Sequence, residues 1–348
     1  MRVGLDATPL LGTRTGVGTY VAGLLDGFLD LGVRPVLTAF TWRGVEALPE
    51  HLERAPRRFS ARALQEAWSR ADWPPVEWLS GPVDVFHGTN FVLPPARRAA
   101  GVVTVHDLSY ETDTVAPASL RYRTLVPRAL ARGAVVVTPS RAVAAEVRDR
   151  YGLDPARVVP TPLGVAGRWY GAHPRCPGLP DEYVLFVGSR EPRKNLPVLL
   201  DAMRSLPGAP PLVLVGPPGW GGIDTTGAIT PGYLSGEALA GAVAHASVFA
   251  FPSRYEGFGL PPLEAFACGT PVVASDLPVL REVLGSLATY APADDAEALA
   301  AVIAAALDAG DGGIAGRAAR RAHAAAFTWG RCAAATLDAY RTALEARA

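Results

Sequence analysis

The chain has 348 residues, 49% of them apolar, and its 33 basic and 33 acidic side chains give a formal net charge of zero. This length predicts about two domains with sizeable cores, and the balanced charge argues against a nucleic-acid-binding protein. The cysteines Cys176, Cys268 and Cys332 form no CxxC pair, which argues against a disulfide framework or a zinc site and fits a reducing cytoplasm.

The N-terminus shows no sign of a targeting segment. Residues 1–11, MRVGLDATPLL, lack a long apolar core and a cleavage site. No apolar run of the chain approaches the roughly 20 residues that a membrane-spanning helix needs. We therefore expect a cytoplasmic protein.

In the first half, apolar strands alternate with helical patterns. Strands are expected at 2–8, 35–40, 84–90, 101–107 and 134–140. Helical spacing at 19–31 ends at Gly32, and Ser140 is a suitable N-cap for a helix at 141–151 that ends at Gly152. This alternation predicts a parallel sheet that binds ligands at the carboxyl ends of its strands.

Three features fall at those strand ends. The loop 12–20 carries Gly12, Gly16 and Gly18 before the first helix; it is a poor dinucleotide fingerprint, and it reads either as backbone that faces an anion or acceptor, or as a flexible turn. His106 and Asp107 follow an apolar strand, where the histidine is either structural or a site residue. His87 leaves another strand and ranks lower, as a supporting or acceptor-side group.

Arginines interrupt the apolar pattern of two stretches in the first half. They are Arg54, Arg57, Arg58 and Arg62 with Trp68 upstream, and Arg121, Arg123, Arg128 and Arg132 within residues 115–132. These residues could form a basic amphipathic face that suits anionic lipid headgroups. A solvated arginine surface is the alternative.

Residues 160–182 are rich in proline and glycine, as an interdomain hinge should be. Strands at 183–189 and 211–216, with a helix at 194–206 between them, restart the alternation. Arg190, Arg193 and Lys194 lie between a strand end and a helix start. Cations there oppose the helix dipole, so a bound anion such as a diphosphate would explain them.

The most informative stretch is residues 253–275. A strand at 247–251 ends at Pro252, a loop with Gly257 and Gly259 follows, and prolines introduce a short helix that ends at Gly269 before a strand at 271–275. Glu256 is placed on the loop and Glu264 in the first turn of the helix. The backbone of Gly257, Phe258, Gly259 and Leu260 between them would hold the phosphates of a diphosphate, and each carboxylate would accept hydroxyls beside it. An acidic surface loop beside a capped helix is the plainer alternative.

EGFGLPPLE, residues 256–264, resembles the E-x7-E signature of retaining family-4 glycosyltransferases. The resemblance implies a GT-B fold, with two doubly wound Rossmann-like domains facing across a cleft. It implies an acceptor-binding domain at 1–165, a nucleotide-sugar-binding domain at 166–325, and a last helix at 326–348 that packs back on the first domain.

The resemblance also assigns roles to residues. His106 would line the donor sugar's site, Lys194 matches the family's lysine, and Tyr233 would lie near the nucleotide base. The family's usual arginine is Ser189 here, so Arg190 or Arg193 would take its role, or the role is absent.

The expected activity is therefore transfer of a hexose from a nucleotide diphosphate sugar to a hydroxyl acceptor, without a metal or other cofactor. The acceptor is a glycan, a lipid-linked glycan or a small molecule. GSREPRKNL, residues 188–196, resembles mannosyltransferases that use GDP-mannose; glucosyl, galactosyl, rhamnosyl and N-acetylglucosaminyl transfer stay open. Retention of configuration and contact with the inner face of the membrane are further expectations. The alternatives are a GT-B-like epimerase or phosphorylase and a catalytically silent sugar-nucleotide-binding module.

Overall fold

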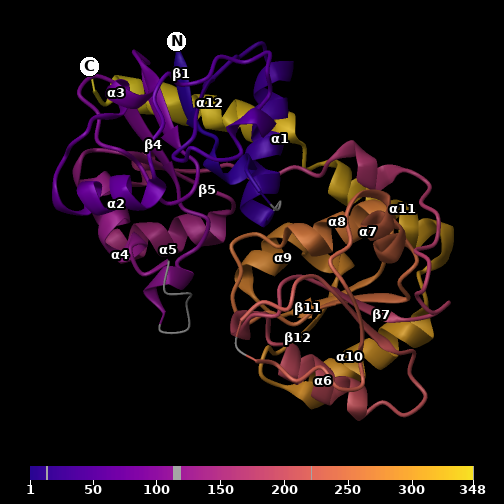
Figure 1. The fold of residues 1–348 in the computed structure, drawn as a ribbon. Helices are drawn as coiled ribbons and strands as arrows, with labels where there is room; N and C mark the ends of the chain where they lie inside the picture. The colour runs from indigo at the N-terminus through magenta and orange to yellow at the C-terminus, as the bar shows by residue number, and fades with distance from the viewer. Residues whose placement is uncertain (13–14, 113–118, 221, 348) are drawn as a thin grey trace. The chain divides into compact units, whose positions relative to one another are not determined.

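The structure is a computed structural model that describes residues 1–12, 15–112, 119–220 and 222–347. The chain forms two compact units (Figure 1). The first comprises Met1–Gly164 together with Thr328–Ala348, and the second comprises Val165–Phe327. No helix among the described residues is long and apolar enough to cross a membrane.

The first unit is built on a six-stranded sheet in which all neighbours are parallel, in the order β2-β1-β3-β4-β5-β6. Almost every strand residue is buried, because helices cover both faces of such a sheet. The strands are β1 (Val3–Asp6), β2 (Val36–Thr38), β3 (Val85–Gly88), β4 (Ala100–Thr104), β5 (Val135–Thr138) and β6 (Val158–Pro160). The helices are α1 (Gly16–Asp30), α2 (Ala61–Arg70), α3 (Val76–Ser80), α4 (Tyr122–Ala131), α5 (Arg141–Tyr151) and α12 (Trp329–Glu345).

Helix α12 packs against α1 and the central strands of the first unit, as its yellow ribbon shows in Figure 1. Two glycines of α1 make this contact close. A Cβ at Gly23 would lie 2.1 Å from the Trp329 ring, and one at Gly27 would lie 2.5 Å from the Trp329 carbonyl oxygen. Thr328 caps α12 by accepting the N–H of Arg331. The last helix therefore completes the core of the first unit.

The second unit repeats the architecture with the strand order β12-β11-β10-β7-β8-β9, again all parallel. Its strands are β7 (Val184–Val187), β8 (Leu212–Val215), β9 (Ile229–Gly232), β10 (Val248–Phe251), β11 (Val272–Ser275) and β12 (Thr289–Ala291). Its helices are α6 (Leu196–Arg204), α7 (Gly236–Ala244), α8 (Leu260–Cys268), α9 (Pro278–Leu284), α10 (Ala296–Ala309) and α11 (Gly313–Ala325). The order reverses between β7 and β10, and this switch point is where such sheets bind ligands.

These elements confirm the predicted α/β class and most of the predicted strands. The predicted caps of α5 are also present: Ser140 accepts the N–H of Val143, and Gly152 adopts the left-handed conformation with φ 61°. Gly269 ends α8 in the same way with φ 88°. Four helix starts were wrong. Helix α1 begins at Gly16 and not at residue 19, and α8 begins at Leu260. Helix α6 begins at Leu196 and not at residue 194, and α12 begins at Trp329 and not at residue 326.

Candidate functional site

The switch point of the second unit brings together two loops that lie far apart in the sequence. One follows β7 and contains residues 188–195, and the other follows β10 and contains residues 252–259. The Arg254 N–H donates to the Arg193 carbonyl at 2.9 Å, and the Asn195 side-chain amide donates to the Pro252 carbonyl at 3.0 Å. Asn195 is fully buried and adopts a left-handed conformation with φ 58°. These bonds hold the two loops together.

Lys194 and Glu256 meet across these loops. The Lys194 Nζ donates to Glu256 Oε1 at 2.6 Å and lies 4.8 Å from the centroid of the Phe251 ring. Lys194 is 7% exposed and Glu256 is 8% exposed. Burial alone would raise the pKa of Glu256, but the positive charges of Lys194 and Arg193 outweigh it and hold that pKa below its usual range. The buried carboxylate is therefore ionised.

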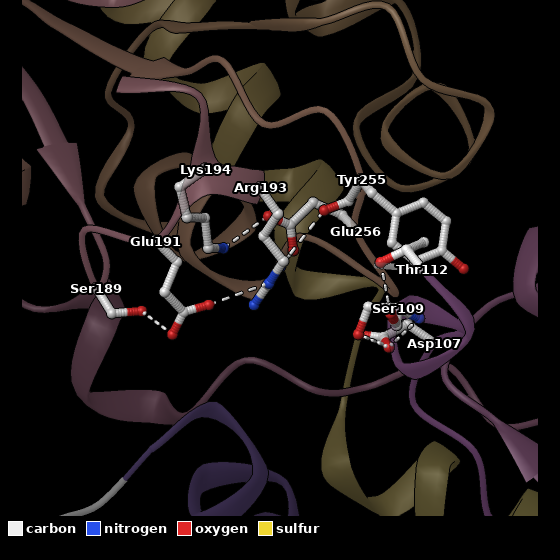
Figure 2. A network of polar contacts seen from close by, with 9 residues as sticks. All are labelled: Asp107, Ser109, Thr112, Ser189, Glu191, Arg193, Lys194, Tyr255 and Glu256. Atoms are coloured by element: carbon white, nitrogen blue, oxygen red, sulfur yellow. Dashed lines mark hydrogen bonds and ion pairs between the residues drawn. The ribbon is translucent and has the colours of Figure 1, made fainter. Parts of the chain in front are cut away.

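Arg193 links Glu256 to a second carboxylate, as Figure 2 shows. Its Nη1 lies 3.4 Å from Glu256 Oε2 and donates to the Tyr255 carbonyl at 3.4 Å, and its Nε lies 3.3 Å from Glu191 Oε2. The Ser189 hydroxyl donates to Glu191 Oε1 at 2.8 Å. Cations and carboxylates thus alternate along one connected network.

Arg190 precedes this network on the same loop. Its side chain is half-buried, and its Nε is enclosed with no hydrogen-bond partner among the residues that the structure describes. Its backbone packs so closely on Gly219 that a Cβ there would lie 2.6 Å from the Arg190 carbonyl oxygen. A buried N–H group without a hydrogen-bond acceptor is uncommon in proteins, so this one indicates that a ligand atom could accept its hydrogen bond.

Glu264 lies in the second turn of α8, which corrects its predicted position in the first turn. The helix starts earlier because Gly259 precedes it in the left-handed conformation and the prolines occupy its first turn. Burial raises the pKa of Glu264 to about 8, while the charge of Arg168 and the indole of Trp169 act in the opposite direction. The pKa of Glu264 is thus affected by Arg168 and Trp169, whereas the pKa of Glu256 is affected by Lys194 and Arg193.

The backbone between the two glutamates is partly enclosed. Phe258 is buried and its ring packs 6.0 Å from that of Phe327, and Leu260 is also buried. Gly259 has φ 92°, and a Cβ there would lie 2.6 Å from Leu280, so this position requires glycine. Gly257 is half-buried. Tyr233 follows β9 and is 54% exposed.

His106 lies in the first unit, just beyond β4. Its Nε2 lies 2.9 Å from the Thr89 carbonyl, which can only accept, so Nε2 carries the proton. Burial lowers the pKa of His106, although Thr89 and Asp107 act in the opposite direction. The neutral ring keeps an acceptor at Nδ1. Asp107 accepts the N–H and hydroxyl of Ser109 and so caps the next segment.

His87 is fully buried in β3. Its Nδ1 lies 2.8 Å from the Tyr340 hydroxyl of α12, and its Nε2 lies 2.7 Å from the Thr104 hydroxyl, which lies 2.9 Å from the Tyr20 hydroxyl. Burial lowers the pKa of His87 to about 3. Both ring nitrogens are used internally, so the acceptor-side alternative was wrong and His87 has a structural role.

Gly16 and Gly18 lie in the first turn of α1 and not in a loop, which corrects their predicted setting. Thr15 is the N-cap, and its hydroxyl accepts the Gly18 N–H at 3.4 Å. Gly18 is buried, whereas Gly16 is exposed. Residues 13 and 14 of the predicted loop lie outside the described residues.

Most arginines of the predicted basic face point to partners within the first unit. Trp68 is buried and donates its N–H to the Pro74 carbonyl, so it belongs to the core. The arginines with internal partners are Arg54, Arg57, Arg121, Arg123, Arg128 and Arg132. Six side chains of this region are exposed, and we call them together the aromatic–arginine surface: Arg57, Arg58, Arg62, Trp42, Trp73 and Trp78. Residues 115–118 of the predicted face lie outside the described residues.

One cavity of the second unit lies away from the switch point. It has a volume of about 880 Å³ and is lined by residues that precede strands, among them Glu182 before β7 and Ser247 before β10. Two lining arginines already bond within the unit: Arg317 pairs with Asp311, and Arg321 donates to the Tyr170 carbonyl. This cavity is therefore at the edge of the sheet opposite to the candidate site.

Two residues of the site, and one polar residue at a strand end of the first unit, were not singled out from the sequence. Glu191 and Asn195 lie in the loop after β7, and Asp6 ends β1 of the first unit. Burial raises the pKa of Asp6 to about 6, and hydrogen bonds from Thr8 act against this rise. Asp6 and Asn195 carried a usable signal, because polar residues that directly follow apolar strands or precede helices are commonly site or cap residues.

No metal site is apparent in the part of the chain that the structure describes, where no group of three or more His, Cys, Asp or Glu could hold an ion. The polar groups of the switch point are instead basic side chains, Arg190, Arg193 and Lys194, with a carboxylate between them. Basic groups at the carboxyl edge of a doubly wound sheet suit an anionic ligand.

Two doubly wound units with such a site define the class of GT-B glycosyltransferases. Residues 14–166 match the model of glycosyltransferase family 4, and residues 181–309 match that of glycosyl transferases group 1. The chain is 31% identical to O-antigen chain mannosyltransferase B of Escherichia coli, over 83% of this chain and 81% of that protein. It is 30% identical to D-inositol 3-phosphate glycosyltransferase of Kribbella flavida, over 99% and 96%. The chain belongs to glycosyltransferase family 4 and is a glycosyltransferase.

Solved structures agree on the fold. Sucrose-phosphate synthase of Thermosynechococcus elongatus superposes with a TM-score of 0.71 at 21% identity, covering 98% of both chains. Anabaena HepE in complex with UDP-glucose superposes with a TM-score of 0.69 at 17% identity, covering 97% of this chain and 98% of that one.

Proposed function

We propose that this glycosyltransferase moves a hexose, with mannose favoured, from a nucleotide diphosphate sugar to a hydroxyl acceptor. The observation that carries the proposal is the buried contact between Lys194 and Glu256 at the switch point of the second unit. A cation suited to a diphosphate lies next to a carboxylate suited to sugar hydroxyls, which supports the proposal. A relative named as a mannosyltransferase supports mannose, and the Anabaena HepE complex with UDP-glucose supports a nucleotide sugar as the donor class.

In the proposal, the side chains of the second unit have separate roles. Lys194 would turn from Glu256 to the diphosphate and stabilise the negative charge that grows there as the glycosidic bond breaks. Glu256 would then accept hydroxyls of the transferred sugar. Glu264 would accept the ribose hydroxyls, and the backbone at Gly257, which is half-buried, would face the phosphates.

In the first unit, the neutral His106 would accept a hydroxyl of the donor sugar at Nδ1, because its Nε2 proton is held by Thr89. The first unit would also bind the acceptor. Retention of the anomeric configuration is part of the proposal through the family resemblance. The base of the nucleotide would lie near Tyr233, with GDP favoured.

Basic side chains of the turn would neutralise the leaving diphosphate, so we propose that no metal or other cofactor takes part. A screen of GDP-mannose, GDP-glucose, UDP-glucose, UDP-galactose, UDP-N-acetylglucosamine and dTDP-rhamnose, by calorimetry and by turnover with and without EDTA, tests donor and metal together. We expect GDP-mannose to bind best and turnover to survive EDTA. Activity that EDTA abolishes and a divalent ion restores would contradict the metal-free mechanism, and binding of none of the donors would contradict the proposed function.

We also propose that the aromatic–arginine surface contacts an anionic membrane. Trp42 and Trp73 are each 62% exposed, and the Arg57 guanidinium lies 5.4 Å from the ring centroid of Trp78. Arg58 and Arg62 are exposed and have no ion-pair partner among the described residues. Indole rings favour the membrane interface and arginines favour anionic headgroups, which would suit a lipid-linked acceptor at the inner face of the cell membrane.

A further inference from the structure

We infer that Glu191 and Arg193 form a positioning pair that holds the Glu256 carboxylate in its working orientation, and that Arg193 is not a contact of the diphosphate. The inference rests on the proposed function, because it assigns separate tasks to the two arginines of the turn. Glu191 acts only through Arg193, and Arg193 acts through Glu256. Arg190 is then the arginine that faces the diphosphate.

The Arg193 guanidinium is surrounded by acceptors. Carboxylates flank it on two sides, with Glu191 Oε2 at 3.3 Å from Nε and Glu256 Oε2 at 3.4 Å from Nη1. The Tyr255 carbonyl is a third acceptor, at 3.4 Å from Nη1. A guanidinium is planar, so acceptors at Nε and Nη1 together fix its plane. A phosphate at the same nitrogens would stand beside two carboxylates and be repelled by both.

The two carboxylate oxygens of Glu256 face different cations. Oε1 accepts Lys194 at 2.6 Å, and Oε2 faces Arg193. When a diphosphate draws Lys194 away, the contact with Arg193 remains. The carboxylate then keeps its charge and its orientation while Oε1 becomes available to a sugar hydroxyl. Without Arg193, the same exchange would leave a buried carboxylate with no cation, which is costly.

Glu191 is itself held in place by a hydrogen bond. Its Oε1 accepts a hydrogen bond from the Ser189 hydroxyl at 2.8 Å, and its Oε2 faces Arg193 (Figure 2). The hydrogen bond from Ser189 therefore fixes the orientation of the Glu191 carboxylate. Ser189 stands where the family resemblance leads us to expect an arginine. In this chain the position therefore supports the network and does not supply a charge. Arg190, whose enclosed Nε has no acceptor among the described residues, is the arginine suited to a ligand.

The test compares Arg193→Gln, Glu191→Gln, the double variant and Arg190→Gln. Dissociation constants for GDP and UDP are measured by calorimetry, and kcat with the best donor is measured as a function of pH. We expect Arg193→Gln to bind the nucleoside diphosphate within about twofold of wild type, to lower kcat about tenfold or more, and to move the acidic limb of the kcat profile to higher pH, because Glu256 loses a cation. Arg190→Gln should weaken nucleoside diphosphate binding about tenfold.

Glu191→Gln should lower kcat by a smaller factor, about threefold, and the double variant should be no slower than Arg193→Gln alone, because both substitutions break one connection. Arg193→Lys keeps the positive charge but loses the planar guanidinium that can bind two acceptors. We therefore expect the acidic limb of its kcat profile to lie at the wild-type pH, while kcat itself stays reduced. Melting temperatures of all variants identify general loss of folding, and Glu191→Gln, which alters a side chain that is 25% exposed, still tests the pair if Arg193→Gln folds poorly.

The inference is overturned if Arg193→Gln weakens nucleoside diphosphate binding as much as Arg190→Gln does, or if it leaves kcat and the acidic limb unchanged. Additive effects of the two substitutions of the pair would also overturn it. A wild-type protein that binds neither nucleoside diphosphate and transfers no sugar would overturn the proposed function itself, and that result is distinct from all the others.

Discussion

Lys194 and Glu256 are 62 residues apart in the sequence, yet their side chains meet at 2.6 Å in a buried ion pair. The pair exists because the adjacent strands β7 and β10 send their following loops to one edge of the sheet. Glu256 neutralises the charge of Lys194, whereas Glu256 itself also faces Arg193, so a ligand that draws Lys194 away must supply an anion for the lysine. A diphosphate joined to a sugar offers an anion for the lysine and hydroxyls for the carboxylate at once.

The first prediction concerns this pair. Lys194→Ala and Glu256→Ala should each lower kcat by about 10²-fold or more, because each removes a group that acts on the transition state. Arg204→Ala, which alters an exposed ion pair with Asp201 in the same unit, is a matched control that should keep wild-type turnover. Wild-type kcat in Lys194→Ala or Glu256→Ala, measured with the true donor and acceptor, would remove that residue from the site.

The second prediction concerns the ionisation of Glu264. Its pKa of about 8 means that the free protein holds this carboxyl protonated at neutral pH. If ribose hydroxyls require the ionised form, GDP should bind more tightly as the pH rises from 6.5 to 8.5, by up to about tenfold for each pH unit below the pKa. Glu264→Gln should remove this slope. An equal slope in Glu264→Gln, measured by calorimetry, would assign the pH dependence to another group.

The third prediction concerns His87 and the stability of the first unit. The folded pKa of about 3 lies below the ordinary value of 6.5, so the unfolded chain binds more protons between these values. The free energy of unfolding should therefore fall as the pH is lowered below 6.5, by up to about 1.4 kcal/mol for each unit. Urea unfolding at pH 7 and pH 5 measures this. Tyr340→Phe should lower stability by about 1 kcal/mol at both pH values and keep the slope, whereas an unchanged slope in His87→Gln would contradict the assignment.

The fourth prediction concerns the contact between α1 and α12. A Cβ at Gly23 would overlap the Trp329 ring, so Gly23→Ala should lower the free energy of unfolding by about 1–3 kcal/mol. Gly330 lies in α12 with open space around it, so Gly330→Ala is a control that should be neutral or slightly stabilising. If urea unfolding gives Gly23→Ala and Gly330→Ala the same free energy of unfolding, the close contact between α1 and α12 does not contribute to stability as predicted.

The fifth prediction concerns the aromatic–arginine surface. The protein should pellet with phosphatidylglycerol vesicles at low salt and much less with phosphatidylcholine vesicles, because exposed arginines attract anionic headgroups. About 0.5 M salt should weaken the binding by screening. Replacing Trp42 and Trp73 by serine together with Arg58→Ser should abolish it. Equal recovery with both kinds of vesicle, or no dependence on salt, would rule this surface out as a membrane contact.

The sequence predicted the repeated α/β units well, because uninterrupted apolar strands and capped helices are local signals. It also predicted that Lys194 and Glu256 follow strands. Their contact arises because β10 is the neighbour of β7 in the sheet, and the sequence does not reveal this strand order. Glu191 was missed because a glutamate in a loop looks like any solvated charge; its partner Arg193 is set by three-dimensional orientation.

Two other differences have local causes. Glycines are poor helix formers, so the start of α1 was placed too late, yet the Thr15 cap and the burial of Gly18 extend the helix to Gly16. The arginines near α2 and α4 form an amphipathic pattern in the sequence, but carbonyl groups such as those of Leu48 and Leu93 accept their N–H groups. Such acceptors cannot be recognised from side-chain types.

The point at which the chain leaves the first unit lies beside the point at which it returns. The Val165 N–H donates to the Phe327 carbonyl at 3.0 Å, and a Cβ at Gly164 would lie 2.2 Å from the Trp329 nitrogen. The 165–327 segment is therefore an insertion whose two ends are fastened together. The segment can therefore be exchanged between relatives as one piece while the interrupted α/β unit around it stays intact, and under the proposed function such an exchange would alter the choice of donor.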